Sequence, residues 1–527
     1  MYDLLIVNGR ILSGMGNPWY WGDVAIVKDR IVKIGQLPKA QAGRVIDAEG
    51  LMISPGFIDG HSHSDLFIFL DPTAEQKTMQ GVTTETLGMD GMSVAPIDAR
   101  KMADWRKHLS GVAGNLKVDW WWESFADYLS AIDALPTSIN VASYVGLGTI
   151  RFNVMGMSDR EATVEEIDRM KHIAVQCMEH GARGISAGLI YPPSQYQRLG
   201  EVIEIAKVVQ ESHGVYNVHL RSEGDRLIEA MEEVFEIGKQ SRIPVIITHF
   251  KISGRRNWGF SEKAMHILDR ARQQGVDVTI EQYPYTAGST MLQVVIPPWY
   301  HAGGPDDLLR MLHDNRDAIK RDIRERTDWE NLPAKNGWES IIVSSVESDA
   351  NKKYEGKSIT EIASMRQLDD ATDAALDLLA EEELAVGMII FHMDEKDVVE
   401  IMKHPSVGFI TDGLLGGSKP HPRIYGTYPR ILGRYVRDHG VLSMEEAVRK
   451  MTSLPAEKLR LKGKGVIAEN HDADITMFDP DTIIDNATYE NPRRFSPGIE
   501  WVIVNGQVVV EKGKHTKVTP GRTIRTR

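Results

Sequence analysis

The sequence has one cysteine, no long apolar run and no excess of basic residues, and each scarcity excludes a class of protein. Cys177 has no partner for an intramolecular disulfide, which favours a reducing, cytoplasmic setting. No stretch of about 18 apolar residues occurs, so neither a transmembrane helix nor a membrane partner is expected. Acidic residues outnumber basic ones, 74 to 61, and the basic ones are scattered, which disfavours nucleic acid as a partner.

What is present indicates a large globular protein. The 527 residues are 42% hydrophobic and 26% charged, enough to bury a sizeable core in one large domain with a smaller one, or in about three ordinary ones. The first ten residues carry an acid where a signal peptide carries positive charge, so no export is expected.

Both ends of the chain show the sequence pattern of antiparallel β-strands. Short runs alternate in period two, and Asn8-Gly9 and Asn505-Gly506 are favoured residues for tight hairpins. We expect residues 1–55 and 460–527 to pack together as one small β domain.

The middle of the chain, residues 56–459, alternates apolar strands with helical patterns. This alternation predicts a parallel sheet. For this many β-α units a closed barrel is the simplest arrangement, although an open doubly wound sheet satisfies the pattern as well. A segment at about 290–375 is too long for a plain connection and is predicted to be an insertion near the mouth of the barrel.

Two histidines follow the first strand of this middle region. His61 and His63 are two residues apart, so on an extended chain both imidazoles project to one side. A His-X-His at a strand end favours a metal site, although the motif alone does not identify the metal.

Two further histidines each end an apolar strand. His219 and His249 are one β-α step apart, which places them on adjacent strands. Either one alone is as readily a core histidine as a ligand, but together they favour a second pair of ligands.

Two aspartates stand in front of glycines at strand ends. Aspartate before glycine usually forms a turn. The position of Asp412 after an apolar strand favours a functional role, whereas for Asp90 the pattern alone favours a turn residue.

These motifs resemble the amidohydrolase superfamily and, within it, the N-acyl-D-amino-acid deacylases (D-aminoacylases). The resemblance covers essentially the whole chain. It is carried by Pro55-Gly56-Phe57-Ile58-Asp59-Gly60-His61-Ser62-His63, Gly188-Leu189-Ile190-Tyr191-Pro192-Pro193, Val218-His219-Leu220-Arg221-Ser222-Glu223-Gly224-Asp225, Thr248-His249-Phe250-Lys251, Tyr283-Pro284-Tyr285-Thr286-Ala287-Gly288-Ser289-Thr290, Asp412-Gly413 and His421-Pro422-Arg423-Ile424-Tyr425-Gly426.

The resemblance implies a TIM-like (β/α)8 metal-dependent hydrolase barrel, with a small β-sandwich built from both termini. It implies that His219 and His249 hold the tighter zinc ion. His61 and His63 would belong to a second, weaker site beside the acid/base residue Asp412. One or two zinc ions per chain are therefore expected.

The sequence departs from the family pattern at two positions. Asp90 stands where the family has a bridging cysteine, and Leu147 where relatives commonly carry histidine. An aspartate can still ligate or bridge zinc, so we expect Asp90 to be a ligand. Because a carboxylate oxygen is a harder donor than a thiolate, the site also suits divalent metals other than zinc.

The resemblance also implies a small-molecule substrate that bears a carboxylate. The matching residues are Lys251, Tyr283, Ser289 and Arg423 around that carboxylate, with Tyr191 as a weaker candidate for polarising the carbonyl. A lysine and an arginine near one carboxylate make charge-assisted bonds that fix its orientation. The oligomeric state is not decided, and a homo-oligomer stays open.

The implied reaction is hydrolysis of an amide C–N bond other than a peptide bond, most simply that of an N-acyl-D-amino acid to a D-amino acid and a carboxylate. A metal-bound hydroxide would attack the acyl carbon while Asp412 carries the proton to the leaving nitrogen. Asp90 and Leu147 keep open a diverged enzyme acting on a cyclic amide, an imide, a dipeptide or a carbamate. A metal-binding protein without catalysis is the remote alternative.

Overall fold

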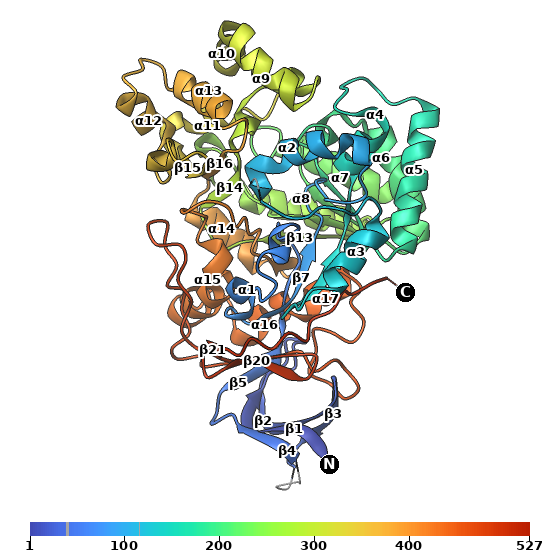
Figure 1. Ribbon diagram of the computed structural model, residues 1–527. Helices are drawn as coiled ribbons and strands as arrows, with labels where there is room; N and C mark the ends of the chain where they lie inside the picture. Colours follow the sequence, from blue (N-terminus) through green and yellow to red (C-terminus); the bar gives the residue numbers. More distant parts are fainter. Residues whose placement is uncertain (38–41, 115, 527) are drawn as a thin grey trace.

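The computed structural model describes residues 1–37, 42–114 and 116–526. A barrel occupies the middle of the molecule, the strands of both chain ends lie below it in the view, and a lobe of helices α9–α13 stands above it (Figure 1). No helix in these described ranges is long and apolar enough to cross a membrane. Cys177 is buried with a free thiol.

Parallel strands form the barrel. One ladder joins β6, β7 and β8, and a second joins β9, β10, β11, β12, β13 and β17. Strands β8 and β9 follow each other with one residue between them and together take one barrel position. The barrel strands are β6 (Phe57–Asp59), β7 (Val82–Leu87), β8 (Asn140–Ser143), β9 (Val145–Gly146), β10 (Gly184–Gly188), β11 (Val215–His219), β12 (Val245–Ile247), β13 (Val278–Gln282) and β17 (Val407–Phe409).

The barrel closes between its first and last strands. A parallel bridge pairs Ser62 with Gly413, and the backbone amide of Asp412 donates to the carbonyl of His61 over 3.0 Å. The predicted closed barrel is therefore confirmed, and the open doubly wound sheet is wrong.

Several of the helices that cover the barrel bury one apolar stripe. In α5 the buried positions are Met170, Ala174, Cys177 and Met178, spaced by about one helical turn, and a capping box at Thr163 begins the helix. The helices are α1 (Glu75–Thr78), α2 (Met102–Ala113), α3 (Phe125–Asp133), α4 (Leu147–Met155), α5 (Val164–Glu179), α6 (Leu199–Glu211), α7 (Leu227–Ser241), α8 (Ser261–Gln273), α14 (Glu395–Lys403), α15 (Arg423–Arg430), α16 (Met444–Met451) and α17 (Ser453–Lys458).

Strands from both ends of the chain share one hydrogen-bonded sheet. Strand β5 pairs with β1 on one side and with β18 on the other, which joins the two terminal segments. Ile6, Ile26, Ile475 and Ile503 belong to one apolar core between them. The strands are β1 (Tyr2–Ile11), β2 (Tyr20–Val27), β3 (Arg30–Gly35), β4 (Ala42–Asp47), β5 (Met52–Pro55), β18 (Ile475–Phe478), β19 (Ile499–Val504), β20 (Gln507–Glu511) and β21 (Lys514–His515).

A lobe with its own core interrupts the barrel between β13 and β17. It begins and ends on antiparallel strands that pair with each other, β14 and β16, so it extends beyond residue 375. Its elements are β14 (Ala287–Met291), α9 (Pro305–Asp314), α10 (Arg316–Glu325), α11 (Leu332–Asn336), β15 (Ile341–Ser345), α12 (Ile359–Met365), α13 (Ala371–Glu381) and β16 (Gly387–Phe391).

Candidate metal centre

Six side chains with metal-binding atoms meet at the carboxyl ends of the barrel strands. Parallel strands all end at the same rim, so residues far apart in sequence converge there. The six are His61 and His63 after β6, Asp90 after β7, His219 at the end of β11, His249 after β12 and Asp412 after β17.

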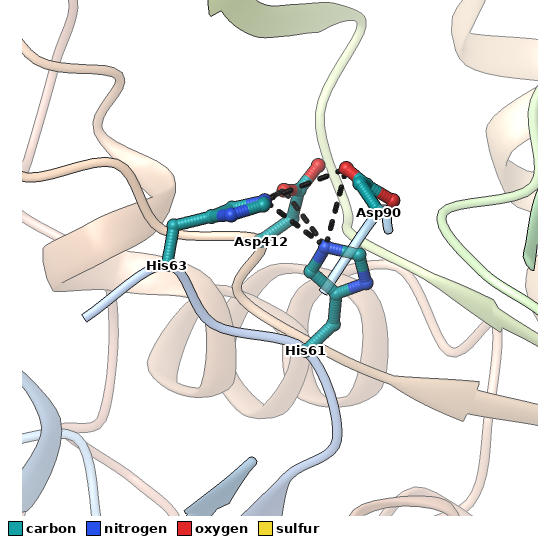
Figure 2. A group of neighbouring side chains, drawn as sticks. All are labelled: His61, His63, Asp90 and Asp412. Atoms are coloured by element: carbon teal, nitrogen blue, oxygen red, sulfur yellow. Dashed lines mark hydrogen bonds and ion pairs between the residues drawn. The ribbon is translucent and has the colours of Figure 1, made fainter. Parts of the chain in front are cut away.

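Four of them form one group of mutual neighbours. Nε2 of His61 lies 3.1 Å from Nε2 of His63, 3.7 Å from Oδ2 of Asp90 and 3.5 Å from Oδ1 of Asp412. Nε2 of His63 lies 3.5 Å from the same Asp90 oxygen and 3.3 Å from the same Asp412 oxygen. Figure 2 shows the four side chains pointing toward one another.

A second group shares Asp90 with the first. The other oxygen of Asp90, Oδ1, lies 3.4 Å from Nε2 of His249 and 3.9 Å from Nδ1 of His219. One oxygen of Asp90 therefore faces His61 and His63 while the other faces His219 and His249. This is the arrangement of a carboxylate that bridges two neighbouring sites.

The donor atoms fit divalent metal ions. Ligand bonds of about 2.1 Å at tetrahedral angles put ligand atoms roughly 3.4 Å apart, and the separations in the first group lie around that value. In the second group, Oδ1 of Asp90 and both ring nitrogens of His219 are buried without a hydrogen-bond partner among the described residues. Burial lowers the pKa of His219 to about 4, so its ring is neutral and carries a free lone pair at pH 7.

Neighbouring side chains orient the histidines. Nδ1 of His61 lies 2.5 Å from Oγ1 of Thr248, and Nδ1 of His249 lies 3.0 Å from Oε1 of Glu223. In both rings the opposite nitrogen, Nε2, faces Asp90. A carboxylate on the far nitrogen of a ligating histidine fixes its ring orientation and raises its basicity. Lys251 in turn pairs with Glu223.

Asp412 is held from its other side by an arginine. Nη1 of Arg423 lies 2.9 Å from Oδ2 of Asp412, whereas Oδ1 faces the histidines. Burial acts to raise the pKa of Asp412, but the Arg423 guanidinium and then His61 hold it below its ordinary value. Asp412 is therefore a carboxylate at neutral pH.

Three of the six residues have strained backbones. Asp90, His249 and Asp412 have φ angles of 54°, 32° and 49°, in the left-handed region that residues other than glycine rarely adopt. Such strain persists only where the surrounding structure enforces it, and it concentrates at functional sites. After Asp90 the chain needs Gly91, because a Cβ there would meet Oγ of Ser194 at 2.5 Å.

The two groups open onto a cavity. Four of the five residues that the sequence predicts to bind the substrate line this cavity: Tyr191, Lys251, Tyr283 and Ser289. Arg423 is fully buried behind it and reaches the cavity through Asp412.

Each of these cavity residues also has a partner within the protein. The hydroxyl of Tyr191 lies 2.8 Å from Oγ1 of Thr290, and Oγ of Ser289 donates to the carbonyl of Met388 over 2.9 Å. The ring of Tyr283 lies under the guanidinium of Arg423, 4.6 Å from ring centre to Cζ.

Sequence reasoning missed two residues of the site. Glu223 is buried four residues after His219 and contacts His249, and His392 lines the cavity at the end of β16. A carboxylate just past a histidine-bearing strand end is a signal that could have identified Glu223. His392 belongs to the lobe, whose approach to the site no local pattern reveals. Leu147 packs in the barrel core and is not among the residues that line the cavity.

Comparisons with known proteins agree with this geometry. A model of the Amidohydrolase family matches residues 44–318 and 329–510. The chain is 34% identical over 523 residues to the D-aminoacylase of Alcaligenes xylosoxydans xylosoxydans, covering 99% of this chain and 97% of the relative.

Two solved structures are similar over the full length. One is a D-aminoacylase with a binuclear metal centre, at a TM-score of 0.84 and 33% identity, with all of both chains covered. The other is an N-acyl-D-glutamate deacylase from Bordetella bronchiseptica in complex with zinc and a phosphonate inhibitor that mimics the tetrahedral intermediate. It has a TM-score of 0.84 and 31% identity, with 99% of each chain covered.

Proposed function

The chain belongs to the amidohydrolase family, and on that premise we propose that it hydrolyses N-acyl-D-amino acids to D-amino acids and carboxylates. The observation that carries the proposal is the pair of donor groups sharing Asp90 at the floor of a cavity bordered by a lysine and two tyrosines. The relatives named D-aminoacylase and N-acyl-D-glutamate deacylase support this substrate class.

The proposed cofactor is zinc, held by His219, His249 and Asp90 in one position and by Asp90, His61, His63 and Asp412 in the other. The donor set of imidazole nitrogens and carboxylate oxygens suits zinc, and the zinc complex of the deacylase relative supports the choice. A zinc ion bound there supplies Lewis acidity, which lowers the pKa of water and polarises a carbonyl.

Asp412 is the proposed proton carrier. In the reaction, water adds its oxygen to the acyl carbon, the C–N bond breaks, and the nitrogen leaves with a proton. Asp412 accepts that proton from the water and returns it to the leaving nitrogen, because an unprotonated amine leaves poorly. The ion pair with Arg423 involves Oδ2 and leaves Oδ1 directed at the histidines.

Lys251, Tyr283, Ser289 and Arg423 are proposed to bind the substrate carboxylate, and Tyr191 to act on the acyl carbonyl. The positions of Lys251 and Tyr283 support this role, because both side chains are buried and line the cavity. Arg423 has five N–H donors, so its guanidinium can serve Asp412 and a second carboxylate. Its Nε is buried without a hydrogen-bond partner among the described residues.

The first test removes the proton carrier. We expect Asp412→Asn to keep the zinc ion held by His219, His249 and Asp90 yet lose about 10²- to 10⁴-fold in kcat, the usual contribution of a positioned acid/base group. The exposed Asp349, replaced in the same way, is the matched control and should keep full activity. An Asp412→Asn variant with normal turnover would remove Asp412 from the mechanism.

The second test is a substrate panel on the wild-type enzyme. N-acetyl-D-amino acids, their L-enantiomers, hydantoins, cyclic imides, dipeptides and N-carbamoyl amino acids are compared by kcat/KM. Hydrolysis of the N-acetyl-D-amino acids supports the proposal. Inert N-acyl-D-amino acids beside an active cyclic amide or carbamate would replace it with the diverged amidohydrolase.

A further inference from the structure

A second cavity adjoins the one above the metal centre. It shares the walls Ile190, Tyr191, Glu330 and Leu332 with the first. The two spaces are therefore neighbouring chambers, and we name the second one the side chamber. The lobe supplies much of its lining, from β14 to Trp329.

Seven of the fourteen residues that line the side chamber are apolar. Met291, Val294, Ile296 and Pro298 lie on one stretch of the lobe, and Leu332 stands at the boundary with the first chamber. A ligand group that passes this boundary would therefore need an apolar stem.

Seven polar side chains also line the side chamber, and four of them carry a buried atom without a hydrogen-bond partner among the described residues. His108, Gln293, Trp329 and Glu330 all line the side chamber. In each, one buried atom lacks a hydrogen-bond partner among the residues that the structure describes: Nε2 of His108, Oε1 of Gln293, Nε1 of Trp329 and Oε1 of Glu330. Leaving a buried polar atom unpaired is costly, so the four atoms around one chamber indicate a polar group that pairs with them.

The chemistry of these atoms describes that group. Oε1 of Gln293 and Oε1 of Glu330 only accept hydrogen bonds, Nε1 of Trp329 only donates, and a neutral imidazole does either. Burial lowers the pKa of His108 to about 3, so this ring is neutral.

The charge of Glu330 is already offset. Its other oxygen, Oε2, lies 2.9 Å from Nζ of Lys335 and accepts from Oγ of Ser222 over 2.6 Å. The side chamber therefore needs no cation. Its unpaired atoms match an uncharged group with one carbonyl oxygen and several N–H donors.

We propose that the side chamber binds an arm of the substrate that has an apolar stem and ends in a ureido group. The carbonyl of this end group accepts from Trp329, and its N–H groups donate to Gln293, Glu330 and His108. The inference rests on the proposed function and adds to it the class of side arm. The arm belongs either to the amino-acid side chain or to the acyl group, and the experiment distinguishes the two.

The experiment measures kcat/KM of the wild-type zinc enzyme for two matched sets of substrates. In the first set, N-acetyl-D-citrulline is compared with N-acetyl-D-arginine and with an N-acetyl-D-amino acid whose side chain is a hydrocarbon of equal length. In the second set, D-alanine carries a ureido-ended, a guanidinium-ended or a hydrocarbon acyl chain of that length.

We expect the kcat/KM of the ureido compound to be at least tenfold higher than that of the other two compounds in one of the sets. The reason is that a site with unpaired hydrogen-bonding groups rejects an analogue that cannot pair with them. The set in which this preference occurs identifies the portion that carries the arm. If the hydrocarbon or guanidinium compounds had an equal or higher kcat/KM in both sets, the inference would be overturned. Hydrolysis of these compounds would still support the proposed function. If none of the six compounds and no N-acetyl-D-amino acid is hydrolysed, the proposed function fails and the inference fails with it.

Two variants test the chamber itself. Gln293→Leu removes an acceptor at nearly constant volume, and Trp329→Phe removes the donor. We expect each to reduce the preference for the ureido compound over the hydrocarbon compound about tenfold. Gln273→Leu, at an exposed position of α8, is the matched control and should keep the wild-type ratio. An unchanged ratio in both chamber variants would overturn the inference, and the wild-type comparison needs no variant to fold.

Discussion

At the scale of single residues, Asp90 lies between the two groups of the candidate metal centre. Its oxygens face opposite pairs of histidines, which a thiolate would have to do with one sulfur atom. Removing this side chain should therefore weaken zinc binding at both positions, whereas removing the His219 side chain should weaken zinc binding at only one.

We expect Asp90→Ala to retain well under one zinc per chain after dialysis, and His219→Ala to retain the ion held by the other group. Metal content by mass spectrometry and zinc affinity by competition with a chelator measure this directly. Equal losses in the two variants would contradict the bridging role. Unchanged zinc in Asp90→Ala would show that this residue is a turn residue only.

Glu223 contacts His249, and we expect it to act on the candidate metal centre through this ring. A residue that orients a ligating histidine usually contributes 10- to 100-fold to metal affinity. We expect Glu223→Gln to weaken zinc binding by about that factor, because the amide replaces a charged partner of both His249 and Lys251.

The matched control for Glu223 is Glu233→Gln. Glu233 pairs with Arg221 on a neighbouring segment and is not among the residues that line the cavity. The Glu233→Gln variant should have the zinc affinity of the wild type. A Glu223 variant that binds zinc as tightly as this control would exclude the positioning role.

The sequence predicts all six donor residues but not how they are supported. His61 and His63 are recognisable by their spacing, and His219, His249 and Asp412 by their positions at strand ends. The pairing of Arg423 with Asp412 joins the start of α15 to the end of β17, which local pattern treats as independent. The bond between Thr248 and His61 depends on which strands meet, so no local signal predicts it.

At the scale of elements, a buried lysine holds the seam of the barrel. Nζ of Lys77, in α1, donates to Oγ of Ser62 over 3.0 Å and to Oγ1 of Thr411 over 2.7 Å, and it forms an ion pair with Asp59. Lys77 and Asp59 are fully buried. Their contacts join the end of β6 to the end of β17, the two strands that carry His61, His63 and Asp412.

We expect Lys77→Met to lower the free energy of unfolding by about 3–5 kcal/mol, because it leaves a buried carboxylate without its cation. Urea denaturation followed by circular dichroism measures the change. Lys239→Met, at an exposed position of α7, should change stability by less than about 0.5 kcal/mol. Adding Asp59→Asn to Lys77→Met should restore part of the loss, and a strictly additive double variant would contradict the seam contact.

The elements themselves are largely predictable, with two informative exceptions. Apolar strands alternating with amphipathic helices indicate the parallel barrel because both periodicities are local. The division of one barrel strand into β8 and β9 around Tyr144 depends on contacts with Leu87, which the local sequence does not encode. The lobe extends to β16 because β14 and β16 pair across it, a contact between distant residues.

At the scale of the whole molecule, the β strands of the chain ends are tied to the barrel by polar contacts as well as by packing. Oδ2 of Asp474 accepts from Nδ2 of Asn140 over 3.1 Å, and Oδ1 accepts from the backbone amide of Asn505 over 2.7 Å. Asn505 also donates to Oδ1 of Asn140 over 2.7 Å, and Lys464 pairs with Asp474. Asn140 is the first residue of barrel strand β8.

The sequence predicts the Asn505-Gly506 turn and the joining of the two chain ends, but not this network. Turn chemistry is local, whereas the network needs the barrel, the segment before β18 and the β19–β20 turn to be placed together. Its polar groups are buried, so each depends on the others for hydrogen bonds.

Such a network should make the terminal strands and the barrel unfold together. Asp474→Ala leaves the side chain of Asn140, the amide of Asn505 and one contact of Lys464 without their acceptor, so we expect stability to fall by about 3 kcal/mol. Because the lost contacts join the two regions, hydrogen exchange measured by mass spectrometry should accelerate in β1, β5 and β18 and equally in β8. The exposed Asp481, changed to alanine, is the control and should leave both rates unchanged. If exchange accelerated in the terminal strands while β8 kept its wild-type protection, the two regions would be separate cooperative units and the network would not couple them.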